Sequence, residues 1–201
     1  GLPIVPQGSH TIYYYSIDTA GNIETTKNQV IKVDTGIPVS NITSPTNGAY
    51  IKGVTYTITG TSSDTGSSNV SQVEISTNNG VTWNLATNTG TNYSTWSYTW
   101  TLPADGTYTL KSRAKDNAGN LETPATSITV SVDNTAPTTT LTTTPATPNG
   151  ENNWFKTTPS ISFSTNESAT TYHQWDSTTG TWLTGLPIVP QGSHTIYYYS
   201  I

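Results

Sequence analysis

The chain contains no cysteine and no methionine, and only 9% of its residues are charged. Without cysteine, neither a disulfide nor a thiolate metal site can form. Seven basic residues are scattered and are outnumbered by twelve acidic ones, so a nucleic-acid partner is not expected. No run of residues is long and apolar enough to predict insertion of this segment into a membrane. A modest apolar core must therefore stabilise a polar, weakly charged chain.

Residues suited to catalysis are also scarce. Arg113 is the only arginine, and His10 and His194 are copies of one position, which leaves His173 as the other independent imidazole. No Gly-x-Ser-x-Gly element marks a hydrolase nucleophile. The spacing of the carboxylates does not indicate a glycosidase pair. We therefore expect that this segment is not an enzyme.

The most informative feature is a long exact duplication. The seventeen residues GLPIVPQGSHTIYYYSI at 1–17 occur again at 185–201, which is 184 residues later. A folded domain has no use for one segment at both of its ends. We therefore expect the sequence to be a window cut from a longer protein with a 184-residue period. Such a period is typical of repeat-built fibres and surface arrays.

A weaker repeat divides this period into two module types. Residues 9–25 (SHTIYYYSIDTAGNIET) align with residues 107–123 (TYTLKSRAKDNAGNLET), and both contain Asp-x-Ala-Gly-Asn-x-Glu. The period then consists of one module of 100 residues and one of 84 residues. We expect residues 1–34 to be the C-terminal strands of one module, 35–134 a complete module, and 135–201 the N-terminal part of the next.

The local pattern predicts an all-β fold. Alternating runs lie between regularly spaced turns, and six Trp and twelve Tyr oppose disorder. Seven short strands with turn-rich joints indicate an immunoglobulin-like β-sandwich. The strands expected in the complete module are Val39–Ser44, Val54–Thr61, Val70–Thr77, Val81–Leu85, Ser94–Thr101, Gly106–Lys115 and Ser127–Val132.

These segments also carry a family resemblance. The stretches VDTGIPVSNITSPTNGAYIKG, VSQVEISTNNGVTWNLAT and WSYTWTLPADGTYTLKSRAKDNAGN resemble the bacterial and archaeal Ig-like modules found in tandem on large secreted or cell-surface proteins. The stretches TTTPATPNGENNWF and GSHTIYYYSIDTAGNIE resemble a sister family with the same ending. The resemblance implies tandem β-sandwich domains in an extracellular or cell-surface setting, and it implies no particular ligand.

Four aspartates are candidate calcium ligands. Asp34 and Asp133 end modules ahead of proline-containing joints, and the segment VDNTAP at 132–137 is similar to a cadherin linker. Asp18 and Asp116 open the Asp-x-Ala-Gly-Asn motifs, and carboxylate oxygens are ligands that calcium prefers. The alternatives are solvated aspartates at strand ends and, for the motif, a hairpin turn whose glycine adopts positive φ. No other cofactor is expected.

The segment 76–83 resembles the Asp-box of sialidases, with Asn78 where that motif carries Asp. That box is a hairpin element and not a catalytic one. A sialidase also needs several arginines to hold its substrate carboxylate, and this chain has one. We therefore expect Asn79-Gly80 to form a tight turn, with Trp83 packed beside it.

The repeated segment offers a candidate interface. Strand alternation directs one set of its side chains outward, including Tyr13, Tyr15 and Ile17 and the copies Tyr197 and Tyr199. Three interpretations stay open: contact with a neighbouring module or fibre strand, stacking on sugar rings, or residues that simply favour β-strands. Candidate glycosylation sequons lie at Asn41, Asn69, Asn92 and Asn166.

The function that follows is structural. The chain is expected to be the repeat unit of an extracellular filament, stalk or surface array built from end-to-end Ig-like domains. Its partners would be neighbouring repeats of the same protein and laterally associated copies. The alternatives are a cell-surface adhesin that binds glycans or cells, and spacer modules of an extracellular hydrolase.

Overall fold

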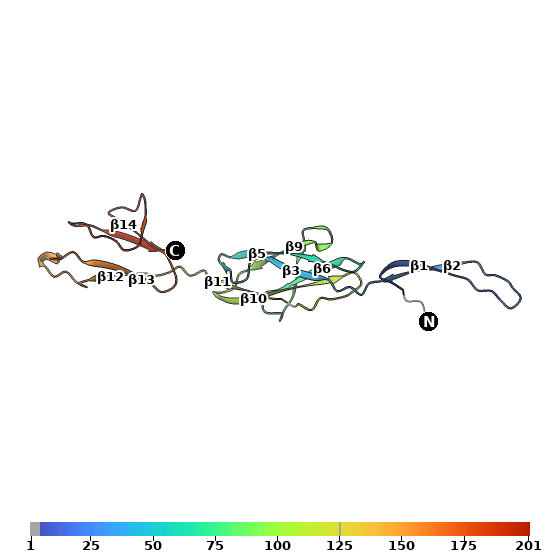
Figure 1. Ribbon diagram of the computed structural model, residues 1–201. Helices are drawn as coiled ribbons and strands as arrows, with labels where there is room; N and C mark the ends of the chain where they lie inside the picture. Colours follow the sequence, from blue (N-terminus) through green and yellow to red (C-terminus); the bar gives the residue numbers. More distant parts are fainter. Residues whose placement is uncertain (1–4, 125) are drawn as a thin grey trace. The chain divides into compact units, whose positions relative to one another are not determined.

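The computed structural model describes residues 5–124 and 126–201 (Figure 1). These residues form β-strands and two short 3-10 helices, η1 (Thr91–Tyr93) and η2 (Glu151–Asn153). No helix among them has the length and apolar character needed to cross a membrane. The fold is all-β, as the alternating pattern predicts.

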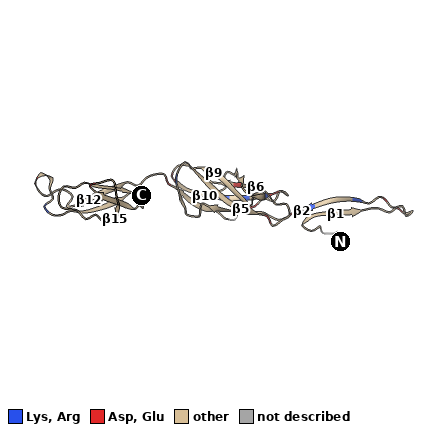
Figure 2. Ribbon diagram, turned by 90° about the horizontal axis from the view of Figure 1, so that it is seen from above, with Lys and Arg blue, Asp and Glu red and all other residues tan. Residues whose placement is uncertain are grey.

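The chain divides into two compact units, Gly1–Asn134 and Thr135–Ile201. The first unit contains a β-sandwich preceded by a two-stranded hairpin, and the second contains a hairpin and a three-stranded sheet. Charged side chains are sparse along most of these strands, as the mostly tan ribbon in Figure 2 shows. The strand Gly106–Asp116 has four of them, and its Arg113 forms an ion pair with Glu74 on the neighbouring strand.

The sandwich has two sheets. One sheet has the order β3 (Val39–Ser44), β5 (Thr55–Ser63), β9 (Thr95–Thr101), β8 (Thr87–Asn88). The other has the order β4 (Tyr50–Ile51), β11 (Ile128–Val132), β10 (Gly106–Asp116), β6 (Val70–Ser76), β7 (Asn84–Leu85). Their facing side chains form one buried core, which includes Ile58, Trp96, Ile75, Leu110 and Val130. This is the predicted sandwich, because apolar residues at alternate positions face the opposite sheet.

The strand boundaries agree with the sequence prediction at most positions. Strand β3 matches it residue for residue, and β5, β6, β9, β10 and β11 match within two residues. The predicted strand Val81–Leu85 is mostly wrong, since only Asn84–Leu85 forms a strand. The reason is that side-chain hydrogen bonds of Asn78 hold Thr82 in a turn. The two-residue strands β4 and β8 are too short to produce an alternating pattern.

Strand β10 spans the sandwich, and the chain joins the sandwich near both of its ends. The backbone carbonyl of Asp34 accepts a hydrogen bond from the Asn120 side chain, in the turn that follows β10. At the other end, the N–H of Asn134 donates to the carboxylate of Asp105, which precedes β10. The strand has eleven residues, which corresponds to a length of about 35 Å. The chain therefore enters and leaves this module at opposite ends.

The N-terminal hairpin pairs β1 (Gly8–Tyr14) with β2 (Lys27–Val33) in a sheet of their own. Their register runs from Gly8↔Val33 to Tyr14↔Lys27. A two-stranded hairpin without a packed face is marginally stable in water. Its side chains are almost all exposed or half-buried, because no second sheet covers either face within the described residues.

The second unit, Thr135–Ile201, contains five strands in two sheets within the described residues. A hairpin pairs β12 (Thr139–Thr144) with β13 (Ser160–Thr165). A separate sheet has the order β15 (Leu183–Thr184), β14 (Thr171–Trp175), β16 (Ile196–Ser200). Strand β16 lies within the second copy of the repeated segment, residues 185–201, and it pairs with β14.

Candidate functional site

The two Asp-x-Ala-Gly-Asn motifs form the same turn. Asp116 Oδ1 accepts hydrogen bonds from the N–H groups of Gly119 and Asn120 at 2.7 and 2.8 Å, and Oδ2 accepts one from the Asn120 side chain. In the N-terminal hairpin, Asp18 Oδ1 accepts hydrogen bonds from the N–H groups of Ala20 and Asn22, and Oδ2 accepts one from the Asn22 side chain. Gly119 has a φ of 100°, which glycine adopts without steric cost. The predicted turn is confirmed at both positions.

Three carboxylates gather where the chain enters the sandwich. Asp34 follows β2, Asp64 follows β5, and Asp116 ends β10; one oxygen from each lies within 4.8 Å of the others. Asp34 Oδ2 accepts hydrogen bonds from the N–H groups of Ser67 and Ser68 at 2.9 and 2.6 Å. Asp34 therefore ties the joint after the hairpin to a loop of the sandwich.

Hydrogen bonds keep two of these groups ionised. The pKa of Asp34 is lowered, chiefly by hydrogen bonding to Ser68. For Asp116, burial is the strongest single influence and raises the pKa, and the nearby charge of Asp34 raises the pKa further. The Asn120 and Gly119 donors outweigh both, so the pKa of Asp116 is also lowered. Asp34 and Asp116 are therefore negatively charged at neutral pH, stabilised by hydrogen bonds from the Ser68 and Asn120 side chains and from backbone N–H groups.

This cluster contains two of the four predicted calcium ligands. Asp34 and Asp116 come together, joined by Asp64, whose Oδ2 is buried and has no hydrogen-bond partner among the described residues. Asp18 and Asp133 do not belong to the group. The carboxylate of Asp18 accepts hydrogen bonds from backbone N–H groups of its own turn, in the exposed hairpin. Carboxylate oxygens suit calcium, and binding of the ion stays a prediction.

The Asp-box-like segment is a turn, as expected. The N–H of Val81 donates to the carbonyl of Asn78, and the two residues between them, Asn79 and Gly80, have φ of 60° and 91°. Positive φ at both central residues is the requirement of a type I′ turn. Trp83 lies beside the turn and against the Arg113 guanidinium, which is 4.2 Å from the centre of its ring. The tight turn and the packing of Trp83 therefore account for the residues of this segment.

The repeated segment presents different side chains on its two faces in the second unit. On the outer face, Tyr199 stacks on Tyr172 at 5.2 Å and meets Trp182 edge-on at 4.8 Å. On the inner face, Tyr198 contacts Phe163 of β13 at 5.2 Å. The predicted alternation is thus confirmed. Of the five candidate interface residues, all are exposed: Tyr13, Tyr15, Ile17, Tyr197 and Tyr199.

His194 forms a contact within the second unit that the sequence did not predict. Its Nδ1 lies 2.6 Å from Asp176 Oδ2, and its Nε2 lies 2.7 Å from the carbonyl oxygen of Gln191. Both neighbours are acceptors, so the doubly protonated imidazolium satisfies both. The carboxylate of Asp176 raises the pKa of His194, and His194 in turn lowers the pKa of Asp176.

This pair gives an expected pH dependence. A raised His194 pKa stabilises the folded unit below the unfolded histidine value of about 6.5, and the effect disappears as pH rises through the folded pKa. The lowered Asp176 pKa sets the acid limit, because its contribution is lost as pH falls through that value. Asp176→Asn should lower the pKa of His194, measured by NMR titration of the ring Cε1–H. An unchanged pKa would show that the ion pair does not form in solution.

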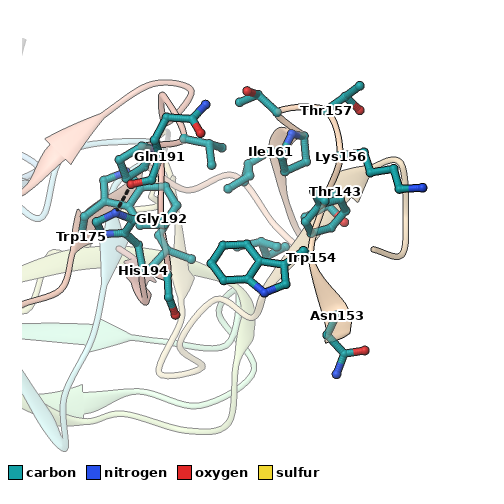
Figure 3. A pocket seen from close by; sticks show the side chains of 18 of the residues that line it. Thr143, Asn153, Trp154, Lys156, Thr157, Ile161, Trp175, Gln191, Gly192 and His194 are labelled. Atoms are coloured by element: carbon teal, nitrogen blue, oxygen red, sulfur yellow. Dashed lines mark hydrogen bonds between the residues drawn. The ribbon is translucent and has the colours of Figure 1, made fainter. Parts of the chain in front are cut away.

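A cavity of about 580 Å³ opens within the second unit. Figure 3 shows Trp154 and Ile161 on one side, and Trp175, Gly192 and His194 on the other. The cavity therefore lies between the β12–β13 hairpin and the residues that lead into β16.

The candidate glycosylation sequons are all accessible. Asn41 lies on β3, Asn92 lies in η1, and Asn69 and Asn166 lie between strands; all four are exposed. Accessibility permits modification and does not show it.

Sequence reasoning did not identify Asp64, Asp176 or Trp182. Asp64 lies thirty residues from Asp34 in sequence, and only the sandwich topology brings them together. Asp176 has a φ of 58°, which aspartate tolerates better than most residues, but nothing nearby marks it as the partner of a histidine. These contacts can be found only when the order and the register of the strands are known.

Comparison with known proteins gives one family match and two distant structural similarities. No curated protein sequence matches the chain. The fibronectin(III)-like modules of CbhA from Clostridium thermocellum align with a TM-score of 0.44 and 17% identity, over 81% of this chain and 85% of theirs. An engineered protein, solved at 1.98 Å, aligns with a TM-score of 0.36 and 23% identity over 48% of this chain, and this chain spans 20% of that protein. Residues 38–111 match the family model of the bacterial Ig domain, so this stretch of the chain is similar to bacterial Ig domains.

Proposed function

We propose that this chain is a repeating structural segment of a long extracellular filament, stalk or surface array, in which Ig-like modules are joined end to end. One observation carries the proposal: the chain enters the complete module beside Asn120 and leaves it beside Asp105, at opposite ends of β10. Modules connected in this way extend a chain, because each adds its length to the previous one. Bacterial Ig domains are commonly extracellular, which fits this role.

Hydrogen bonds and close packing around Asp34 hold the joint between β2 and the complete module in place. Asp34 accepts three backbone hydrogen bonds, from Gly36, Ser67 and Ser68. Gly66 packs so closely against this carboxylate that a Cβ would overlap it. The joint is therefore fastened to the sandwich by groups that a flexible linker lacks, which suits a load-bearing connection.

Electron microscopy of the purified filament tests the proposal. A sandwich of this type is about 35–45 Å long, so one 184-residue period should advance roughly 70–90 Å along the axis. Tandem modules labelled once per period would then show regular spacing in this range. A spacing far below it would contradict the end-to-end arrangement.

An adhesin is the second candidate, because aromatic rings suit sugar binding. The outer face of β16 displays Tyr199, Tyr172 and Trp182. These rings already pack against one another, whereas a sugar requires a free ring face. We therefore place adhesion second to a structural role.

A further inference from the structure

The first and the last parts of the complete module are joined directly. Strand β4 pairs with β11 in parallel, with Tyr50 opposite Ser131 and Ile51 opposite Val132. The other strand pairs of the described sandwich are antiparallel. Since β11 is the last strand of the module and β4 follows its first strand, β3, the parallel pair links the two ends of one fold.

Hydrogen bonds continue this pairing beyond the two residues of β4. Backbone N–H groups donate to backbone carbonyl oxygens from Gly48 to Thr129 at 2.7 Å, from Ser131 to Ala49 at 2.9 Å, and from Asp133 to Ile51 at 3.0 Å. The segments 47–53 and 128–134, with the bonds between them, form what we term the terminal ladder. Both segments supply donors, so the ladder is a continuous parallel pairing and not a single contact.

Two asparagine side chains extend the terminal ladder at its two ends. Asn47 Oδ1 accepts a hydrogen bond from the N–H of Thr129 at 2.8 Å. Asn134 Oδ1 accepts one from the N–H of Gly53 at 2.7 Å. The bonded residues are 82 and 81 positions apart in sequence, so neither bond belongs to a local turn. Both asparagines are exposed, and their side chains hold two distant segments together.

The core anchors the terminal ladder to the rest of the sandwich. Ile51, Val130 and Val132 are 6%, 0% and 2% exposed, and all three belong to the buried core. Asn134 also donates its backbone N–H to the carboxylate of Asp105, which precedes β10. Neither segment can therefore detach without exposing apolar side chains to water.

Both segments of the ladder run toward the Asp105 end of the module. Strand β11 ends at Val132, opposite Gly106 at the start of β10, and β4 is parallel to β11. The chain joins the module at the Asp116 end of β10 and leaves it at the Asp105 end. Tension between the two ends of the module therefore pulls the two segments in opposite directions along their length.

This direction determines how the hydrogen bonds break. When two paired strands are pulled along their length, the bonds between them lie across the force and are loaded together. When the strands are pulled apart from one end, the bonds are loaded one after another. Sliding therefore needs the larger force, and forced unfolding is governed by the rate of unfolding and not by equilibrium stability.

We propose that the terminal ladder, closed by Asn47 and Asn134, is the part of the complete module that resists tension along the chain. This inference rests on the proposed function, since a filament or stalk transmits tension from one module to the next. The ladder sets the rate of unfolding under such tension, because the two ends of the module cannot move apart until its segments slide past each other.

Pulling the chain in two directions tests the proposal. The chain contains no cysteine, so paired cysteine substitutions in the full chain give defined attachment points for optical tweezers. Thr35→Cys with Ala136→Cys applies the force along the module and makes the ladder slide. Lys52→Cys with Ala136→Cys applies the force at one end of the ladder and peels it open. All three positions are exposed. The first pair should unfold at a force several times higher than the second, at the same loading rate.

Substitutions at the two asparagines test their part, with the force applied along the module. Asn47→Ala with Asn134→Ala removes two acceptors and should raise the rate of unfolding under constant tension by about tenfold. Asn47→Asp keeps an acceptor oxygen for the N–H of Thr129 and should unfold at the wild-type rate. The matched control is Asn88→Ala, which removes an exposed asparagine whose Oδ1 accepts the N–H of Gly90 outside the ladder. This control should also unfold at the wild-type rate.

The proposal is overturned if the two directions of pulling give equal forces. It is also overturned if the double-alanine variant and Asn88→Ala unfold at the same rate under tension. Circular dichroism shows whether each variant is folded before it is pulled. If the double-alanine variant is unfolded, the comparison of directions decides alone, because both asparagines are intact there. Equal forces, with the axial repeat still observed by microscopy, would reject the ladder and leave the filament role standing.

Discussion

Asp116→Ala should lower the free energy of unfolding of the complete module by about 3 kcal/mol, since each buried polar group left without a partner costs about 1–3 kcal/mol. Asp116 is 1% exposed, and its carboxylate accepts hydrogen bonds from two backbone N–H groups and from the Asn120 side chain. Alanine would leave these donors without their acceptor, in a turn where little water can replace it. Urea denaturation followed by tryptophan fluorescence measures the change.

Asp18→Ala is the matched control for that substitution. The sequence motif is the same, and Asp18 likewise accepts two bonds from backbone N–H groups and one from an asparagine side chain. Asp18 is exposed, however, so water can satisfy the released donors. We expect no measurable change in the free energy of unfolding. An equal loss for both variants would show that the turn itself, and not its burial, determines the cost.

Trp96→Ala should destabilise the complete module by about 4 kcal/mol. The Trp96 side chain is 1% exposed in the centre of the core, and its indole N–H donates to the carbonyl of Thr61 at 3.1 Å. Gly60 leaves the space for this ring, because a Cβ there would overlap the indole and the carbonyl oxygen of Asn41. The substitution thus removes packing and a hydrogen bond from a site shaped for one residue.

The control for this second substitution is Trp83→Ala. Trp83 is half-buried on the surface and contacts the Arg113 guanidinium, so its loss should cost about 1 kcal/mol. Differential scanning calorimetry compares the two variants. Similar losses in both would contradict the assignment of the core.

Much of the fold could be predicted from the sequence, because its signals are local. The alternation of apolar residues determined β3 and β10, and the glycines of the Asp-x-Ala-Gly-Asn motifs indicated turns that the structure confirms. The inward and outward sets of the repeated strand followed from the same alternation, as the contacts of Tyr198 and Tyr199 show. In each case a few neighbouring residues contain the whole signal.

The candidate site was harder to predict, because it depends on strand order. Asp34 and Asp116 were recognised as ligand types, but Asp64 joins them only because β5 and β10 belong to facing sheets that end at the same edge. Asp133 and Asp18 have similar local sequences and lie outside the cluster. The pairing of His194 with Asp176 likewise depends on where β14 meets β16, which no local pattern contains.

Electron microscopy of a chain that carries residues 1–184 twice in succession tests the central claim most directly, namely that the modules are joined end to end. The account predicts an extended particle about 140–180 Å long, because each copy should add roughly 70–90 Å. A compact particle less than half that length would contradict the account.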